Sequence, residues 1–171
     1  MRVLVSAASQ QGATAEIAKA IGEELATKGL DVKVASPDKV AWLAGTDAVI
    51  LGSAVYAGHW LAPAVRLAGR VGTELIGRPV WLFSSGPVGD PSKKLARSMG
   101  ADPVDLPSLM AKTKAREHRM FAGKLDRHQI HGLQRAALFA FRGLEGDFRD
   151  WAAVRDWADD IAGQLGAVAS H

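Results

Sequence analysis

The chain has 171 residues, of which 48% are hydrophobic and 23% are charged. These proportions are typical of soluble globular chains, and the length predicts a single domain covering residues 1–171 with one sizeable core. The sequence has no cysteine, which excludes thiolate catalysis, disulfides, iron–sulfur clusters and cysteine-ligated zinc. The longest apolar run of the C-terminal half, Ala136–Phe141, is far shorter than the ~20 residues of a membrane span. The N-terminal apolar stretch is too short for a signal peptide, so we expect a cytoplasmic protein.

Charge is unevenly distributed along the chain. The formal net charge is +3, yet residues 93–142 hold eleven basic and four acidic side chains, a local net of +7. A basic segment of this kind predicts an anionic ligand, partner or surface, with a solvated face as the alternative. No recognition helix or zinc motif accompanies it, so we expect no nucleic-acid partner.

Short β-rich segments alternate with segments of helical spacing. In chain order, the expected elements are a strand at Arg2–Ala7, a helix at Ala13–Lys28, strands at Asp31–Ala35 and Asp47–Gly52, a helix at Leu61–Arg70, a strand at Pro79–Ser84, two helix-sized pieces within Pro91–Ala115, a strand at Glu117–Ala122, and helices at Asp126–Leu144 and Asp150–Leu165. Five strands alternating with helices predict a three-layer α/β sandwich around a parallel sheet, for which the order 2-1-3-4-5 is the common one.

The loop after the first strand predicts an anion site. In such a sheet a ligand binds beyond the carboxyl ends of the strands, where the strand order reverses, so the loops after strands one, three and four are the ones to compare. Residues 9–14 lead directly into a helix whose free backbone N–H groups favour a single terminal phosphate, and Ser9 and Thr14 add hydroxyl donors. The loop has neither the lysine of a Walker loop nor a Gly-x-Gly-x-x-Gly pattern. An ordinary strand–helix turn is the alternative.

The other two loops combine small, aromatic and hydroxyl residues. In residues 52–60, glycine and alanine permit the close approach of a flat ligand, while Tyr56 and Trp60 offer aromatic faces for stacking. No acidic partner follows His59 in sequence, which favours a helix-start or solvent residue over a catalyst. Residues 84–90 bring two serines and two glycines, whose polar groups suit the edge of a heterocycle. A plain turn-rich loop is the alternative.

The three loops together resemble those of the flavodoxin superfamily, over most of the chain from Arg2 to about Leu165. The phosphate loop of that superfamily reads hydroxyl-x-hydroxyl-Gly-x-Thr, and residues 9–14 match it except at Gln11, which replaces the second hydroxyl. More narrowly, the chain resembles the flavodoxin-domain family that includes the menaquinone-dependent protoporphyrinogen dehydrogenases. The segments that carry this narrower resemblance are Gly12–Ala18, Gly52–Trp60, Phe83-Ser84 and Gly146–Trp151.

The resemblance implies FMN as the cofactor, with its phosphate on the first loop and its isoalloxazine between the other two. The residues that it implies for FMN binding are Ser9, Gln10, Gln11, Gly12, Ala13, Thr14, Ser53, Ala54, Val55, Tyr56, Ala57, Gly58, Ser84, Ser85, Gly86 and Gly89. It also implies, by position, that the backbone carbonyl of Gly58 or Ala57 accepts a hydrogen bond from reduced flavin N5–H. Because the cofactor carries the redox chemistry, we expect no catalytic side chain and no metal.

Charge separates two roles for such a flavin. The sequence pI of about 9.4 is opposite to the acidic character of small flavodoxin carriers, and basic surroundings favour the anionic reduced flavin. The hypothesis is therefore an FMN-dependent oxidoreductase that oxidises an anionic substrate such as protoporphyrinogen IX, a step of heme biosynthesis, and passes the electrons to a quinone. A flavodoxin-type electron carrier and a flavin-free binding module remain as alternatives. A phosphorelay receiver is disfavoured, because the first loop has no acidic residue before Glu16.

The expected helix Asp126–Leu144 has a basic face. At 100° per residue, Arg127, His131, Arg135 and Arg142 fall on one arc, with Phe139 beside it. Residues 127–142 therefore predict peripheral contact with a membrane surface or with an anionic ligand. The alternative is a helix that covers the sheet and has a solvated outer face.

Overall fold

The structure is a computed structural model that describes residues 1–86, 102–125 and 146–169. The predicted helix Asp126–Leu144 and the membrane contact proposed for residues 127–142 lie outside these ranges. So does the first of the two helical pieces expected within Pro91–Ala115. Among the described helices, none combines the length and the apolar character that crossing a bilayer requires.

A parallel sheet of five strands forms the centre of the molecule, in the order β2-β1-β3-β5-β6. These strands are β1 (Arg2–Ala8), β2 (Asp31–Ala35), β3 (Ala48–Tyr56), β5 (Val80–Ser85) and β6 (Glu117–Phe121). A short strand, β4 (His59–Trp60), pairs antiparallel with the end of β3. Counting only the parallel strands, the order is 2-1-3-4-5, so the predicted topology is confirmed, with the reversal of strand order between β1 and β3.

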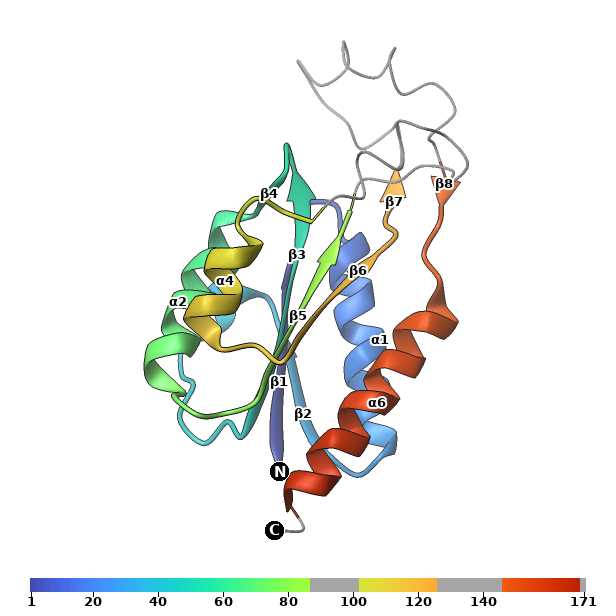
Figure 1. The fold of residues 1–171 in the computed structure, drawn as a ribbon. Coiled ribbons are helices and arrows are strands. Elements are labelled where there is room, and N and C mark those ends of the chain that lie inside the picture. The colour runs from blue at the N-terminus through green and yellow to red at the C-terminus, as the bar shows by residue number, and fades with distance from the viewer. Residues whose placement is uncertain (87–101, 126–145, 170–171) are drawn as a thin grey trace.

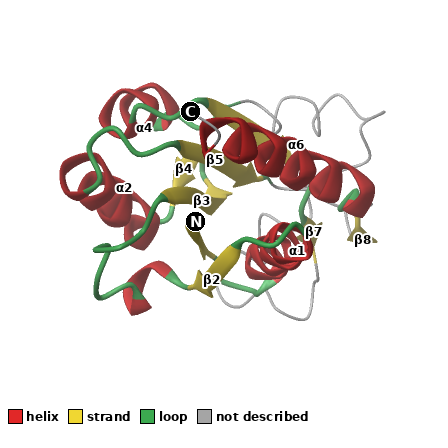
Figure 2. Ribbon diagram, turned by 90° about the horizontal axis from the view of Figure 1, so that it is seen from below, coloured by secondary structure: helices red, strands yellow, loops and turns green. Residues whose placement is uncertain are grey.

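Helices cover both faces of the sheet, which gives the predicted three layers (Figures 1 and 2). One face is covered by α1 (Ala13–Thr27) and α6 (Trp151–Ala169), and the other by α2 (Ala62–Glu74) and α4 (Leu106–Thr113). The remaining elements are a single turn, η1 (Pro37–Lys39), and an antiparallel pair of short strands, β7 (Lys124–Leu125) and β8 (Gly146–Asp147).

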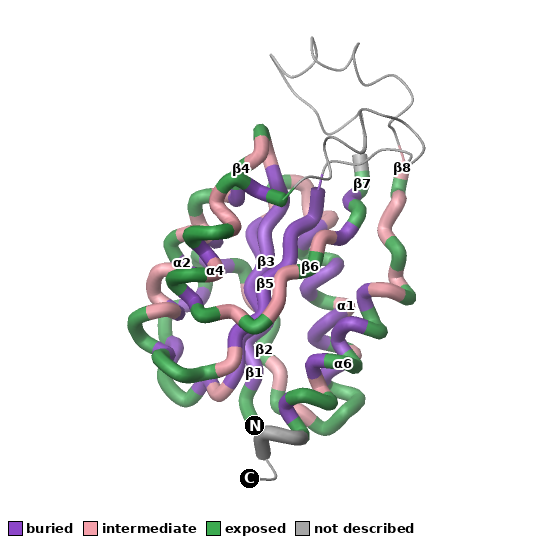
Figure 3. Tube along the Cα trace, in the orientation of Figure 1, coloured by how far each residue is buried: buried purple, intermediate pink, exposed green. Residues whose placement is uncertain are grey.

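The three central strands β1, β3 and β5 are buried along most of their length because helices cover both faces (Figure 3), whereas the edge strands β2 and β6 are mostly exposed or half-buried. Alternate residues of β1 face opposite layers: Val3 and Val5 pack toward α1 and α6, whereas Leu4 packs toward α2. The α1–α6 side contains an edge-to-face aromatic cluster whose ring centroids are 5.5–6.1 Å apart. Its members are Phe83, Phe121 and Trp157.

Helix α2 is longer than the sequence pattern predicted. The expected end was Arg70, but the helix continues to Glu74. Val71, one turn after the buried Leu67, extends the apolar stripe, and it is 1% exposed. Arg70 and Glu74 form an ion pair of 2.8 Å across the added turn, which adds a few tenths of a kcal/mol to an exposed helix. The stripe therefore outweighs Gly72, whose low helix propensity would favour an earlier end.

Candidate functional site

The three candidate loops leave the same edge of the sheet. The register places Ala8 at the end of β1 opposite Ser53 on β3, and Ser53 in turn opposite Ser84 on β5. The carboxyl ends of these strands therefore meet at the upper edge in Figure 1. The predicted site residues of the first loop, of β3 and of β5 are brought together, as the topology required. Gly89 lies outside the described residues.

The first loop ends in an open helix N-terminus. Gly12 is the N-cap of α1, with a left-handed φ of 86°, and a Cβ built on it would meet no described atom within 4 Å. Because the N-cap residue is a glycine, it supplies no side-chain acceptor to the N–H groups of the first turn. Several backbone N–H groups of this turn therefore point toward the carboxyl edge with the positive end of the helix dipole behind them, which is the arrangement that binds anions.

A serine of this loop has an unsatisfied hydroxyl. The Ser9 Oγ is buried and has no hydrogen-bond partner in the part of the chain that the structure describes. Leaving such a group unpaired costs about 1–3 kcal/mol, so a ligand that bonds to it would recover this cost. Thr14 is 2% exposed and belongs to the helix, while Gln10 is exposed and Gln11 and Ala13 are half-buried. The donors of the loop thus suit a group rich in acceptor oxygens, as a phosphate is.

Arg149 anchors the start of α1 from the far end of the chain. Its side chain is 4% exposed, donates to the Ala13 carbonyl at 3.3 Å, and pairs with Glu16 at 2.6 Å and with Asp147 at 2.5–2.8 Å. The guanidinium also lies 4.5 Å above the ring of Trp151. The hydrogen bond from Arg149 holds the pKa of Asp147 below its usual value. The sequence marked this segment only through the resemblance and assigned Arg149 no role.

The second loop is largely strand. The sequence predicted that the third strand would end at Gly52, but β3 continues to Tyr56, and β4 folds back on it through a turn at Ala57 and Gly58. Both turn residues have positive φ, 49° and 81°, which is the conformation of a type I′ hairpin turn. We call residues 53–60 the β3–β4 hairpin. The prediction of a nine-residue open loop is wrong because β3 finds a further antiparallel partner there.

Ser53 holds the base of this hairpin together. Its hydroxyl donates to the Ala54 carbonyl at 2.8 Å and accepts the backbone N–H of Leu61 at 2.9 Å. Ser53, Ala54 and Val55 are all buried. Ligand contact at these positions therefore stays a prediction that rests on the backbone, since the Ser53 hydroxyl is engaged within the fold.

The tip of the hairpin is fastened to the segment that leads into α4. The Val104 N–H donates to the Gly58 carbonyl at 2.9 Å. The Asp105 carboxylate accepts the Trp60 backbone N–H at 2.9 Å and lies 3.2 Å from Nδ1 of His59. His59 is exposed, as expected, and although no acidic residue follows it closely in sequence, Asp105 lies beside it in the fold, 46 residues away. Sequence distance concealed the pair.

Of the two aromatic residues in the hairpin, only Tyr56 remains accessible. Trp60 is 4% exposed and packs in the core on the α2–α4 side, so the prediction that it offers a stacking face is wrong. The reason is that β4 turns its side chain under the hairpin. Tyr56 is half-buried, and burial raises the pKa of its phenol. An aromatic contact to a flat ligand therefore falls to Tyr56.

The end of β5 carries a buried polar cluster. Ser84 is 0% exposed, and its Oγ lies 2.7 Å from the indole Nε1 of Trp60 and 2.8 Å from Nε2 of His118. Nδ1 of His118 lies 3.6 Å from a carboxylate oxygen of Asp102. Burial lowers the pKa of His118, although Asp102 and Glu117 act in the opposite direction. We call Trp60, Ser84, His118 and Asp102 the Ser84 cluster; no local pattern in the sequence indicates it.

The other predicted residues at the end of β5 are also inside the fold. Ser85 is 5% exposed, and the Gly86 N–H donates to the Phe121 carbonyl of β6 at 3.1 Å. Ligand contacts by Ser84, Ser85 and Gly86 stay predictions. For Ser84 the side chain is already engaged, so a contact there would use the backbone.

Fold and site define a flavodoxin-like protein: a parallel sheet of this order, with an open helix N-terminus after the first strand and a hairpin beside it. The chain belongs to the Flavodoxin domain family, which matches residues 4–150. No curated protein sequence matches the chain significantly.

Solved structures of flavodoxins share the fold. A flavodoxin from the domain Archaea has a TM-score of 0.64 at 18% identity, over 97% of this chain and 99% of that one. A mutant flavodoxin from Pseudomonas aeruginosa gives 0.58 at 18% identity, over 97% and 99%. Rubredoxin oxygen:oxidoreductase from Desulfovibrio gigas gives 0.61 at 13% identity, over 97% of this chain but 36% of that one. At these identities the likeness concerns the fold.

Proposed function

We propose that the protein binds FMN at the carboxyl edge of its sheet and uses it in electron transfer. The observation that carries this proposal is the unpaired, buried Ser9 hydroxyl beside the uncapped N-terminus of α1. Together they offer side-chain and backbone donors to one small anion, and a terminal phosphate fits that donor set. Membership of the Flavodoxin domain family supports FMN as the molecule that carries the phosphate.

The residues present fit such a cofactor. Ser9 and the first turn of α1 would hold the phosphate, and the β3–β4 hairpin, with the half-buried Tyr56, would lie along the ring system. Bound FMN would supply the electron-accepting chemistry that the protein side chains lack. The Gly58 carbonyl already accepts from Val104, so the Ala57 carbonyl is the better candidate to accept a hydrogen bond from the ligand.

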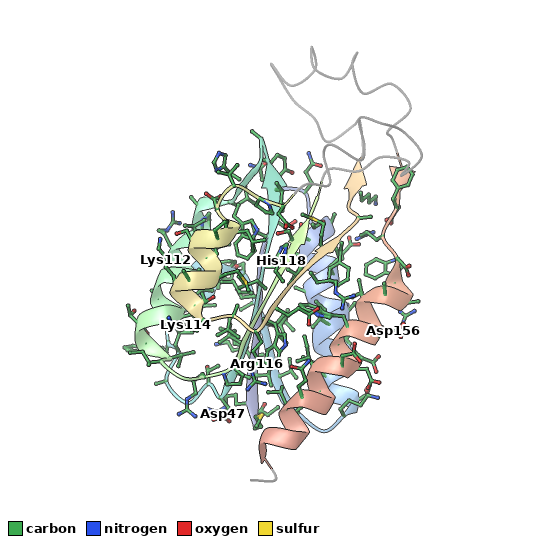
Figure 4. The ribbon with its side chains drawn as sticks, viewed as in Figure 1. Asp47, Lys112, Lys114, Arg116, His118 and Asp156 are labelled. Atoms are coloured by element: carbon green, nitrogen blue, oxygen red, sulfur yellow. The ribbon has the colours of Figure 1, made fainter. Side chains whose placement is uncertain are left out.

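Within this function, we propose the oxidation of an anionic substrate rather than simple carriage of electrons. The support is charge: the pI of about 9.4 favours anionic partners and the anionic form of reduced flavin. Protoporphyrinogen IX, with its carboxylates, is the substrate that the narrower resemblance suggests, and a quinone is the acceptor. Of the basic segment 93–142, the described part includes Lys112, Lys114 and Arg116, which run from the end of α4 to the start of β6 (Figure 4). Arg116 bonds to the first residue of β5, so these three side chains lie at the edge of the sheet opposite the candidate site and would act on an anionic partner only at long range.

The binding experiment compares two serines and two ligands. Ser9 and Ser6 both carry buried hydroxyls without a described partner, but Ser6 lies within β1 and Ser9 on the loop. Removing a hydrogen bond to a charged group costs about 1.5–3 kcal/mol, so Ser9→Ala should weaken FMN binding about ten- to hundredfold. Ser6→Ala should leave the FMN affinity unchanged. Riboflavin, which lacks the phosphate, should bind wild-type protein and Ser9→Ala equally.

Flavin fluorescence and absorbance titrations measure all of these affinities. An equal loss for FMN and riboflavin in Ser9→Ala would refute the phosphate assignment. A protein that binds neither ligand would favour the flavin-free binding module. If FMN binds, its midpoint potential and anaerobic turnover with protoporphyrinogen and a quinone analogue separate the two redox roles. A potential as low as that of a ferredoxin, without turnover, would favour the electron carrier.

A further inference from the structure

One arrangement of hydrogens in the Ser84 cluster gives the Ser84 hydroxyl both a donor and an acceptor. The indole N–H of Trp60 can only donate, so the Ser84 oxygen, 2.7 Å away, accepts it. The Ser84 hydrogen then donates to Nε2 of His118 at 2.8 Å. That bond requires the neutral form of His118 with its hydrogen on Nδ1, on the side of Asp102; the reverse bond, from Nε2–H to the Ser84 oxygen, requires the other tautomer or the protonated ring.

The cluster has the residue types of a hydrolytic triad but not the access. Serine, histidine and aspartate follow one another as nucleophile, base and orienting acid do in such enzymes. Ser84 is 0% exposed, however, and its oxygen is covered by the indole N–H of Trp60. A nucleophile must reach its substrate, so the geometry argues for an internal role. His118 lies on β6, the strand that pairs with β5, and so reaches Ser84 from within the sheet (Figure 4).

The cluster is joined to the β3–β4 hairpin through Trp60. That residue is held at two points: its backbone N–H by Asp105, and its indole N–H by Ser84. Asp105 is itself three residues from Asp102, on the segment that also holds the Gly58 carbonyl through Val104. Anything that alters the bond between Ser84 and Trp60 therefore acts on the element proposed above to lie along the flavin ring.

We propose that His118 is a positioning residue whose protonation state sets how firmly the β3–β4 hairpin is held. Neutral His118 accepts the Ser84 hydrogen and leaves the Ser84 oxygen to Trp60. Protonated His118 donates from Nε2, so the Ser84 oxygen faces two donors and its own hydrogen loses its acceptor in a buried site. An unpaired buried hydroxyl is costly, and the bond to Trp60 weakens as Ser84 reorients.

The charges around His118 set where this change occurs. Among the described residues, the charged groups that act on His118 are the carboxylates of Asp102, on the segment leading into α4, and of Glu117, on β6 itself. Ser84, which contacts His118 from β5, is uncharged. Both carboxylates favour the protonated ring, whereas burial, the largest influence, favours the neutral one. The Asp102 carboxylate is 69% exposed, so it also gives the ring a route for a proton from solvent.

The test uses flavin-free protein, so it does not depend on the proposed function. The indole N–H resonance of Trp60, identified with Trp60→Phe, is followed by NMR as the pH falls from about 7.5 to about 4.5, the range of histidine titration. We expect it to move in one step, together with the ring protons of His118. In His118→Gln, whose side-chain oxygen can accept the Ser84 hydrogen without titrating, the step should vanish. In Asp102→Asn it should move to lower pH.

His59→Gln is the matched control, because His59 lies in the hairpin itself and contacts Asp105 but not Ser84 or His118. The step should persist in this variant. A flat Trp60 resonance in the wild type, a step that survives His118→Gln, or one that disappears in His59→Gln would each overturn the proposal.

The consequence for the proposed function is measured separately. Loss of about one neutral hydrogen bond corresponds to about a fivefold rise in the FMN dissociation constant below the step. His118→Gln should show no such rise. This second part rests on FMN binding; a protein without flavin affinity would refute the proposed function and leave the NMR result for His118 intact.

Discussion

Two glycines of α2 allow the packing of the α2–α4 layer to be tested with the same substitution. Gly69 and Gly72 lie one turn apart in this helix. A Cβ at Gly69 would meet no described atom within 4 Å, whereas one at Gly72 would lie 2.3 Å from the backbone carbonyl oxygen of Lys112 at the end of α4. A backbone atom cannot move aside as a flexible side chain can, so α4 would have to shift.

The two substitutions should change stability in opposite directions. Alanine at either position gains about 0.5–1 kcal/mol in helix propensity. Gly69→Ala should keep that gain, which for a chain of this size raises the melting temperature by about 2–4 °C. Gly72→Ala also incurs the overpacking cost of about 1–3 kcal/mol, and the very short contact places it at the upper end. The net loss is then about 2 kcal/mol, a fall of about 4–8 °C.

Urea denaturation and thermal melts followed by circular dichroism measure both variants. An unchanged slope of the urea transition would show that the difference lies in stability and not in the compactness of the unfolded chain. If Gly72→Ala were as stable as Gly69→Ala, the close approach of α2 to α4 would be refuted, and with it the position of the segment 102–105 that holds the hairpin.

Three further outcomes are expected. Gly12→Ala and Gly29→Ala, at φ 86° and 82° and with no described atom within 4 Å of a Cβ built at either, should each lose about 1 kcal/mol in denaturation, but only Gly12→Ala should also weaken FMN binding. Arg149→Gln should unfold more easily than Arg149→Lys, which keeps the charge, and NMR should show the pKa of Asp147 rising in the glutamine variant as its partner is lost. Burial lowers the pKa of His118 in the folded protein, so as the pH falls the unfolded chain binds a proton at this histidine before the folded protein does. The urea midpoint should therefore fall as the pH drops from 6.5 to the pKa of folded His118. His118→Gln should remove this contribution to the pH dependence.

The sheet could be predicted because its signals are local. A strand covered on both faces is a short, nearly continuous apolar run, and the stretches around Ile50 and Leu82 have this form. The order of the strands then follows from rules of handedness and connection that apply to all such sheets. The site edge follows from that order, which is why the three loops could be selected before their geometry was known.

The contacts that organise the site could not be predicted in this way, because they join residues far apart in sequence. Ser84 meets His118 across 34 positions, and Arg149 meets Glu16 across 133. Such pairs depend on the register of β5 with β6 and on where β8 approaches α1. No periodicity or motif encodes either. For the same reason, the burial of Trp60 follows from the hairpin and could not be read from the aromatic residue itself.

The serine hydroxyls near the carboxyl edge of the sheet differ in whether they have hydrogen-bond partners within the fold, and this difference separates two parts of the site. Ser53 lies within β3 and Ser84 near the end of β5, and the hydroxyls of both are engaged by neighbouring donors and acceptors. Ser9 is half-buried, but its Oγ is buried and no described group bonds to it. Ser6, inside β1, is also buried without a described partner, so the missing partner alone does not indicate a ligand; Ser9 differs because it lies on the loop that leads into α1. Ser9 lies where the dipole of α1 favours an anion. Ser53 belongs to the β3–β4 hairpin, and Ser84 bonds to Trp60 of that hairpin, which Asp105 also holds in place. One part of this edge therefore offers donors to an anionic ligand, and the other part holds the hairpin in position beside that ligand.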